Sequence, residues 1–166
     1  MIFVTVGSQV PFDRMIKAVE AWAIEKGRTD EMFYQIGAGV PPTTGQWKRS
    51  IPPDEYRRLC QQASVIVGHA GTGIWMTSTE LAKRLILFPR RFATFHEHRN
   101  EHQYDMCLRV APTKSVTIAF TVEELHTYLN TPEHIIVPAS KSPEKDELIN
   151  AVRLFIHTGT LLPPRK

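Results

Sequence analysis

The stretch that decides the fold is residues 65–83, which read VIVGHAGTGIWMTSTELAK. It opens with a β-branched apolar run, Val65–Val67, which is typical of a buried strand. Three glycines then fall within the segment Gly68–Gly73, and a helical pattern follows from about Ile74. Glycine allows a left-handed backbone and the close approach of another group. The order of these features predicts a strand, a tight loop and a helix.

The loop between that strand and that helix is a candidate anion site. It consists of His69, Ala70, Gly71, Thr72 and Gly73. The first turn of a helix presents free N–H groups and the positive end of the helix dipole, so phosphate is a natural occupant. No lysine follows the last glycine, as an ATP P-loop requires, and the spacing is not that of a dinucleotide fingerprint. The alternative is that the glycines only close a tight turn.

Apolar runs alternate with helical patterns along the rest of the chain. This alternation predicts an α/β fold, with a Rossmann-like parallel sheet and helices on both faces. The predicted strands are Ile2–Val6, Met32–Ile36, Val65–Val67, Leu85–Phe88 and Val116–Phe120. Helical spacing is found around residues 15–23, 56–63, 104–111, 122–129 and 148–156. We expect one domain over residues 1–157, a long proline-rich loop at residues 38–53, and a frayed tail at residues 158–166.

Composition narrows the classes of partner. The 166 residues carry a net charge of +3, which is compatible with an anionic ligand or an acidic membrane surface but does not indicate nucleic acid. Cys60 and Cys107 form neither a disulfide framework nor a metal-ligand spacing, so a reducing cytoplasm is expected. The sequence begins as a strand and not as a signal peptide, and no apolar run is long enough to cross a bilayer. We therefore expect any membrane attachment to come through a partner.

A second glycine loop follows the first predicted strand. It consists of Gly7, Ser8 and Gln9. In an open α/β sheet, ligands bind beyond the carboxyl ends of the strands, and both glycine loops belong to that edge. Two such loops at one edge favour ligand binding over simple turn closure.

The segment FHEHRNEHQ, residues 95–103, allows three interpretations. His98, Glu101 and His102 match the H-x-x-E-H pattern of inverted zinc peptidases, although no third ligand is evident. Alternatively, the segment is a solvated polar loop that Asn100 caps before a helix. The third interpretation is a sugar-recognition loop, in which Asn100, Glu101 and Gln103 bind hydroxyl groups.

Arg90 and Arg91 lie before this segment, shortly after a predicted strand, and His98 lies within it. His98, Arg90 and Arg91 are candidates to face a phosphate or a carboxylated sugar. Two arginines at a strand end also commonly meet solvent or a diphosphate. The sequence therefore leaves the role of Arg90 and Arg91 open.

Four segments in a fixed order carry a family resemblance: MIFVTVGSQVPFDRMIKAV, VIVGHAGTGIWMTSTELAK, LILFPRR and EHRNEHQ. Together they resemble the C-terminal, donor-binding domain of glycosyltransferase family 28. The free-standing small subunits are the most similar type, namely the PssE-like subunit of exopolysaccharide synthesis and the catalytic half of the dolichol-pathway N-acetylglucosaminyltransferase. The likeness covers residues 1–111. It implies the equivalent of the C-terminal half of a GT-B enzyme, an inverting transferase that uses a UDP-sugar.

The resemblance also implies a role for individual positions. The loop of Gly7, Ser8 and Gln9 would face the diphosphate and the acceptor, and residues 69–73 would cradle the phosphates. Ile51 would lie near uracil, and Glu80 matches the glutamate that binds the ribose hydroxyls. Asn100 and Gln103 match positions that hold sugar hydroxyls. The bulky residues 74–76 depart from the small ones expected after the last glycine.

The implied reaction needs no metal and needs a second protein. No Asp-x-Asp occurs in the sequence, so we expect no metal cofactor, with helix-terminus stabilisation of the departing UDP in its place. A chain of 166 residues cannot hold both halves of a GT-B enzyme. We therefore expect a membrane-associated, PssD-like partner that binds a lipid-linked saccharide acceptor at the inner face of the membrane. His69 is the one candidate base in the loop itself, and the alternative is that its imidazole bonds loop carbonyls. A non-catalytic enhancer subunit is the alternative function.

Overall fold

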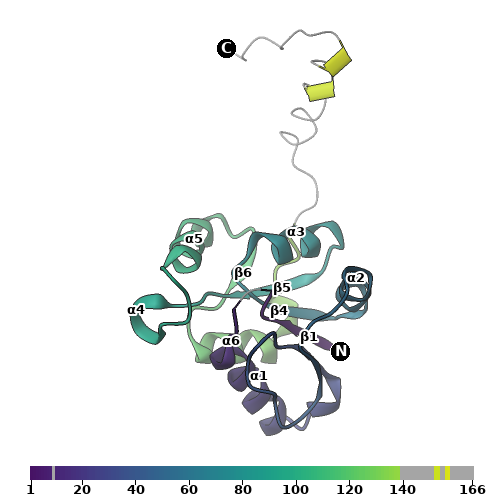
Figure 1. Ribbon diagram of the computed structural model, residues 1–166, viewed down its shortest axis with the longest axis vertical. Coiled ribbons are helices and arrows are strands. Elements are labelled where there is room, and N and C mark those ends of the chain that lie inside the picture. The colour runs from purple at the N-terminus through teal and green to yellow at the C-terminus, as the bar shows by residue number, and fades with distance from the viewer. Residues whose placement is uncertain (9, 139–151, 154–155, 158–166) are drawn as a thin grey trace.

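The computed structural model describes residues 1–8, 10–138, 152–153 and 156–157, and its centre is a parallel sheet (Figure 1). The described strands pair in the order β3-β2-β1-β4-β5-β6, and every pairing is parallel. Their bounds are β1 Ile2–Thr5, β2 Met32–Gln35, β3 Gln46–Lys48, β4 Val65–His69, β5 Arg84–Phe88 and β6 Thr117–Ile118. The strand order reverses between β1 and β4, which is where such sheets bind ligands.

Helices cover both faces of the sheet. Their bounds are α1 Asp13–Glu25, α2 Pro53–Gln62, α3 Thr72–Glu80, α4 Phe92–Phe95, α5 His102–Val110 and α6 Val122–Asn130, with short 3-10 turns at Thr29–Glu31, Ala111–Thr113 and Pro132–His134. Helices α1 and α6 share one apolar cluster with alternate residues of β1, and α2, α3 and α5 share the other. The two groups lie on opposite sides of the sheet in Figure 1.

The alternation within β1 shows why both faces are covered. Ile2 and Val4 point into the cluster of α1 and α6, whereas Phe3 between them points into the cluster of α2, α3 and α5. All three side chains are at most 2% exposed. A strand that is apolar on both faces must be buried on both, as parallel sheets require. The expected Rossmann-like fold is confirmed.

Two elements were not expected from the sequence. The proline-rich segment expected as a loop contains the edge strand β3, whose three residues are all exposed and therefore show no apolar pattern. The short helix α4 occupies part of the expected polar loop after β5. The expected helix at residues 148–156 lies mostly outside the described residues, as do Gln9 and the expected tail at residues 158–166. Within the described residues, no helix is long and apolar enough to cross a membrane.

Candidate functional site

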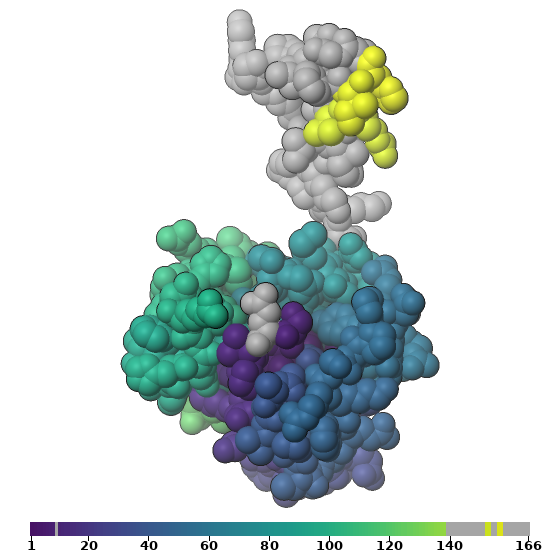
Figure 2. Space-filling model, in the orientation of Figure 1, coloured from purple at the N-terminus to yellow at the C-terminus, as the bar shows by residue number. Residues whose placement is uncertain are grey.

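A cleft of about 750 Å³ opens at the carboxyl edge of the sheet, above the point where the strand order reverses. In the space-filling view the N-terminal residues lie at the centre of this face, between later segments on either side (Figure 2). The loops that follow β1, β2, β3, β4 and β5 all contribute. The lining residues are Val6, Gly7, Ser8, Val10, Gln35, Gly37, Ala38, Arg49, Ser50, Ile51, Tyr56, His69, Gly71, Thr72, Gly73, Ile74, Thr77, Arg90, His98 and Gln103.

The N-terminus of α3 forms the floor of the cleft. Gly71 precedes the helix in an extended conformation, and no side chain caps the first turn. A Cβ added to Gly73 would meet no heavy atom within 4 Å among the described residues, so this turn borders open space. Uncapped N–H groups beside open space, at the positive end of a nine-residue helix, are suited to an anion.

His69 lies between the two glycine loops. A Cβ on Gly7 would come within 2.5 Å of its Cε1 atom, and a Cβ on Gly71 would collide with its Nε2 atom. Burial, followed by the charge of Arg90, lowers the pKa of the imidazole to about 4, so His69 is neutral at neutral pH. Its Nδ1 atom is buried and has no hydrogen-bond partner among the described residues.

Gln35, at the end of β2, holds the loop that follows β1. Its Oε1 atom accepts hydrogen bonds from the Thr5 hydroxyl (2.7 Å) and the Gly7 amide (3.2 Å). Its Nε2 atom donates to the carbonyls of Gly7 and Arg49, each at 3.0 Å. Sequence reasoning missed this residue, although a polar residue near the end of a predicted buried strand was an available signal.

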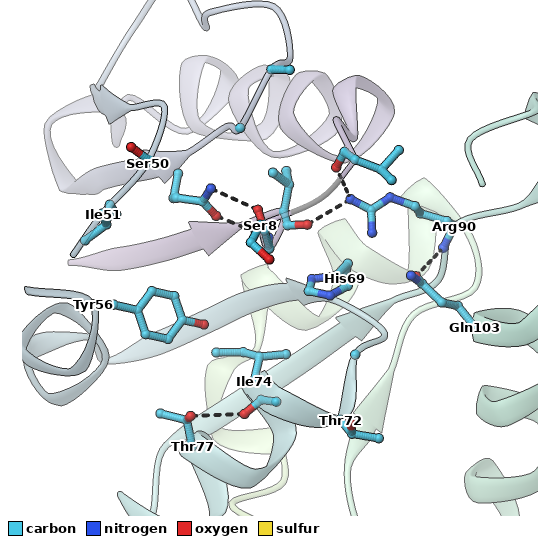
Figure 3. Close-up of a pocket in the computed structure, with 18 of the residues that line it drawn as sticks. Ser8, Ser50, Ile51, Tyr56, His69, Thr72, Ile74, Thr77, Arg90 and Gln103 are labelled. Carbon is cyan, nitrogen blue, oxygen red and sulfur yellow. Dashed lines mark hydrogen bonds between the residues drawn. The ribbon is translucent and has the colours of Figure 1, made fainter. Parts of the chain in front are cut away.

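Arg90 is turned toward the loop after β1. Its Nη2 atom donates to the carbonyls of Val6 (2.8 Å) and Val10 (2.5 Å), and its side chain is almost fully buried. Its backbone amide donates to Oε1 of Gln103 at 3.2 Å. Burial lowers the pKa of Arg90 to about 10, which leaves it a cation at neutral pH. Arg90 and Gln103 therefore belong to one bonded unit at the cleft wall (Figure 3).

The other polar residues predicted around residues 98–101 bind groups within residues 91–102. Asn100 Oδ1 lies 3.3 Å from His98 Nδ1 and accepts from the His102 amide at 3.2 Å. Glu101 accepts from the Ala93 amide at 2.6 Å and pairs with Arg91 at 3.5 Å. Neither Asn100 nor Glu101 lines the cleft. No group of three metal-binding side chains occurs among the described residues, so the H-x-x-E-H interpretation finds no third ligand there.

At the opposite end, the wall is partly apolar. Ile51, the Tyr56 ring and Ile74 lie together there, and Thr77 stands one helical turn further along α3 (Figure 3). The Thr77 hydroxyl donates to the Gly73 carbonyl at 3.0 Å. Glu80, a further turn along, does not line the cleft.

Glu80 is instead bound on the outside of the molecule. Its Oε2 atom pairs with Arg57 of α2 at 3.1 Å, and both side chains are more than half exposed. Ala70, also expected in the phosphate loop, is 3% exposed and packs in the core. The structure thus does not bring Glu80 or Ala70 to the cleft. The predicted residues that it does bring there are Gly7, Ser8, Ile51, His69, Gly71, Thr72, Gly73, Arg90, His98 and Gln103.

The cleft is cationic. Arg49 and Arg90 both line it, and the lining residues within the described part of the chain include no aspartate or glutamate. Sequence reasoning missed Arg49, which donates to the carbonyls of Gly37 and Gly39 at 3.2 and 3.1 Å. Because a divalent cation prefers carboxylate oxygens, this set of side chains suits a bare anion better than a metal complex.

Solved structures with the same fold include glycosyltransferases. The chain is similar to ALG13, solved by NMR in solution, with 16% identity, a TM-score of 0.58, and coverage of 89% of this chain and 93% of that chain. MurG of Acinetobacter baumannii is 14% identical with a TM-score of 0.50, and the chain spans 41% of its length, with 80% of this chain covered. The glycotransferase of kitacinnamycin is 12% identical with a TM-score of 0.53. The match covers 92% of this chain and 38% of that chain. Identities this low show the fold alone. No curated protein sequence matches the chain.

The family is shown by the sequence as a whole. The family model described as glycosyltransferase family 28 C-terminal domain matches residues 1–145. That range includes every strand of the sheet and every residue of the cleft. The expected resemblance is confirmed, and the chain belongs to the glycosyltransferase family 28 C-terminal domain family.

Proposed function

We propose that this chain is the donor-binding subunit of a two-component inverting glycosyltransferase that uses a UDP-sugar. One observation carries the proposal: an uncapped helix N-terminus meets a cationic cleft at the sheet edge, and the described lining residues include no carboxylate. A nucleoside diphosphate is an anion with an apolar, planar base, and the cleft offers complementary regions for both parts.

In this proposal the donor spans the cleft from one end to the other. The uracil ring lies against Ile51 and Tyr56, and the diphosphate lies on the amides of residues 71–73. The ribose then lies near Thr77, because Glu80 would have to leave Arg57 to reach it. The sugar extends toward Gln103 and the wall formed with Arg90. Figure 3 shows His69 between these two ends.

The chemistry is a displacement at the anomeric carbon. An acceptor hydroxyl forms the new bond from the face opposite to UDP, the bond to the β-phosphate oxygen breaks, and UDP leaves with the bonding electrons. The amides at the start of α3 stabilise the negative charge that develops on the phosphate. Removing one such preorganised donor typically lowers the rate by about two to three orders of magnitude. No metal is required in this scheme.

The acceptor hydroxyl must also lose its proton, and this chain offers a poor base. The described cleft lining holds no carboxylate, and the pKa of His69 is lowered to about 4. We therefore assign acceptor binding and the base to a second, membrane-associated polypeptide at the cytoplasmic face. The acceptor is a lipid-linked saccharide in polysaccharide synthesis, and the transferred hexose is glucuronate, glucose, galactose or N-acetylglucosamine.

Calorimetry with UDP tests the donor site. We expect binding that persists in a chelating buffer and that weakens at high salt, because the diphosphate meets fixed positive charge. No binding to UDP, or binding that requires a divalent cation, would contradict the proposal. Gln103→Ala in the complex with its partner separates an enzyme subunit from a non-catalytic enhancer, because only the former should lose transfer activity.

A further inference from the structure

Two segments at the sugar end of the cleft hold each other through a pair of arginines. Residues 6–8 and 10–12 follow β1, and residues 89–101 follow β5. Arg90, in the second segment, donates to the carbonyls of Val6 and Val10 in the first. This contact joins residues 80 or more positions apart in the chain.

Arg14 makes the reverse connection. It lies in the first turn of α1, directly after the first segment, and its Nη2 atom donates to the Pro89 carbonyl at 3.0 Å. Its Nε and Nη2 atoms also bind the two oxygens of Glu97 at 2.7 and 2.9 Å. Glu97 in turn accepts from the Arg91 amide at 3.0 Å. Arg90 of the second segment therefore binds the backbone of the first, and Arg14, directly after the first segment, binds the backbone of the second.

Aromatic rings fill the space between the two arginines. Phe12 and Phe88 stack with centroids 5.7 Å apart. Arg14 lies 4.4 Å from the Phe88 centroid, and Arg90 lies 4.8 Å from that of Phe12. The Arg14 and Glu97 side chains are only 18% and 12% exposed. A two-point ion pair that is largely shielded from water is screened by salt much less than an exposed pair.

We infer that Arg14 and Glu97 are positioning residues for the sugar half of the cleft. Neither lines the cleft. They act through Arg90, whose amide holds Gln103 and whose guanidinium holds the segment after β1. None of these hydrogen bonds involves residues 71–73 at the start of α3, where the diphosphate is proposed to bind. The part of the inference that concerns the sugar rests on the proposed donor site, whereas the mutual restraint of the two segments does not.

The test compares Glu97→Gln with Arg28→Gln. Arg28 is a matched control: it makes the same two-point bond to Glu31, at 2.6 and 2.7 Å, and stacks 5.2 Å over Trp22, but it does not line the cleft. Calorimetry with UDP and with a panel of UDP-hexoses gives two affinities per variant. We expect Glu97→Gln to weaken the best UDP-hexose about tenfold while UDP stays within about twofold. Arg28→Gln should leave both unchanged.

A purely structural role predicts a different result. In that case Glu97→Gln would weaken UDP and UDP-hexose equally, or neither, and the inference would be wrong. Arg14→Lys keeps the charge but loses the two-point bond, so it should recover part of the sugar affinity that Arg14→Gln loses.

Amide hydrogen exchange of the protein without ligand measures how firmly the two segments hold each other, independently of donor binding. We expect Glu97→Gln to speed exchange of the Gly7 and Ser8 amides, across the contact from the substitution, and Arg28→Gln to leave them unchanged. Unchanged exchange in both variants would overturn the mutual restraint even if UDP bound as proposed. If the wild-type protein failed to bind UDP while exchange still rose, the proposed function would fall and the restraint would stand.

Discussion

The imidazole of His69 occupies the space that a side chain on Gly7 would need. A Cβ at Gly7 would lie 2.5 Å from Cε1 of His69, and Gly7 has a φ of +79°. Two glycine loops from different strands thus meet at one ring. The contact fixes the distance between the loop after β1 and the start of α3.

Gly7→Ala should therefore destabilise the protein by more than its backbone strain alone. A left-handed alanine costs about 1–2 kcal/mol, and overpacking against His69 adds about 1–3 kcal/mol. Gly27→Ala is the control, because Gly27 also has a positive φ of +63° but no described heavy atom lies within 4 Å of an added Cβ. Urea unfolding should give a clearly larger loss of unfolding free energy at Gly7. Equal losses would mean that the His69 contact is unimportant.

The same contact predicts coupling between the two residues. In the double variant Gly7→Ala/His69→Ala, the smaller side chain leaves room for the new methyl group. The combined loss of unfolding free energy should be smaller than the sum of the single losses by about 0.5–3 kcal/mol. Strict additivity would contradict the packing relationship.

Replacing Gln35 with methionine should loosen the loop after β1. The substitution keeps the volume but removes the acceptor of the Thr5 hydroxyl and the donor to the Gly7 carbonyl. The Gly7 amide keeps the Thr5 hydroxyl at 3.4 Å, and the Arg49 carbonyl keeps the Gly37 amide at 2.9 Å. A buried polar group left unsatisfied costs about 1–3 kcal/mol, so we expect a loss of about that size in unfolding free energy. Gln62→Met on the exposed face of α2 is the control and should change stability by less than about 0.5 kcal/mol.

His69 should make the protein less stable in mild acid. Its pKa is near 6.5 in the unfolded chain and about 4 in the folded protein. Between these values the unfolded state binds more protons, so the free energy of unfolding falls as the pH is lowered from about 6.5 toward 4. The loss at the acid end is at most about 3 kcal/mol, and above pH 6.5 the group contributes nothing.

His69→Gln provides the comparison for that pH dependence. The two proteins differ only at residue 69, so the difference between the two stability curves isolates His69. We expect the curve of the variant to be flatter between pH 6.5 and 4. Parallel curves would show that His69 protonates normally in the folded protein.

Thr77 and Glu80 offer a test of the ribose position. Thr77→Val removes the hydroxyl that lines the cleft, and we expect UDP affinity to fall about fivefold, in line with one lost hydrogen bond. Glu80→Gln should leave UDP affinity within about twofold, because Glu80 pairs with Arg57 outside the cleft. The opposite ranking in calorimetry would restore Glu80 as the ribose contact.

Most of the fold was predictable because the strands of the core are short apolar runs. Residues 2–4 and 65–67 are apolar and buried, and such runs are visible without any partner. The edge strand Gln46–Lys48 was not predictable, because it is exposed along its length and is defined by its pairing with β2. Helix α4 is only four residues long, too short to show a period.

The glycine positions of the site were predictable from the sequence. The polar side chains were not, because their partners depend on the fold. Gly7, Gly71 and Gly73 were found because their residue type is itself the signal. Glu80 and Glu101 are equally suited in type to bind hydroxyls, yet Arg57 and Arg91 engage them. In the sequence Gln35 is only a residue near the end of a predicted strand. Its role becomes visible when the structure shows its hydrogen bonds to Gly7 and Arg49.

The sequence by itself determined the alternation of strand and helix, the glycine loop before α3 and the membership in the family. All three depend on the spacing and the type of residues along the chain, and no long-range contact is needed to see them. Only the tertiary structure decided which polar groups reach the cleft and which pair elsewhere. A charged side chain takes the best partner within a few ångströms. For Glu97 and Glu80 those partners are Arg14 and Arg57, which lie 83 and 23 positions away in the chain.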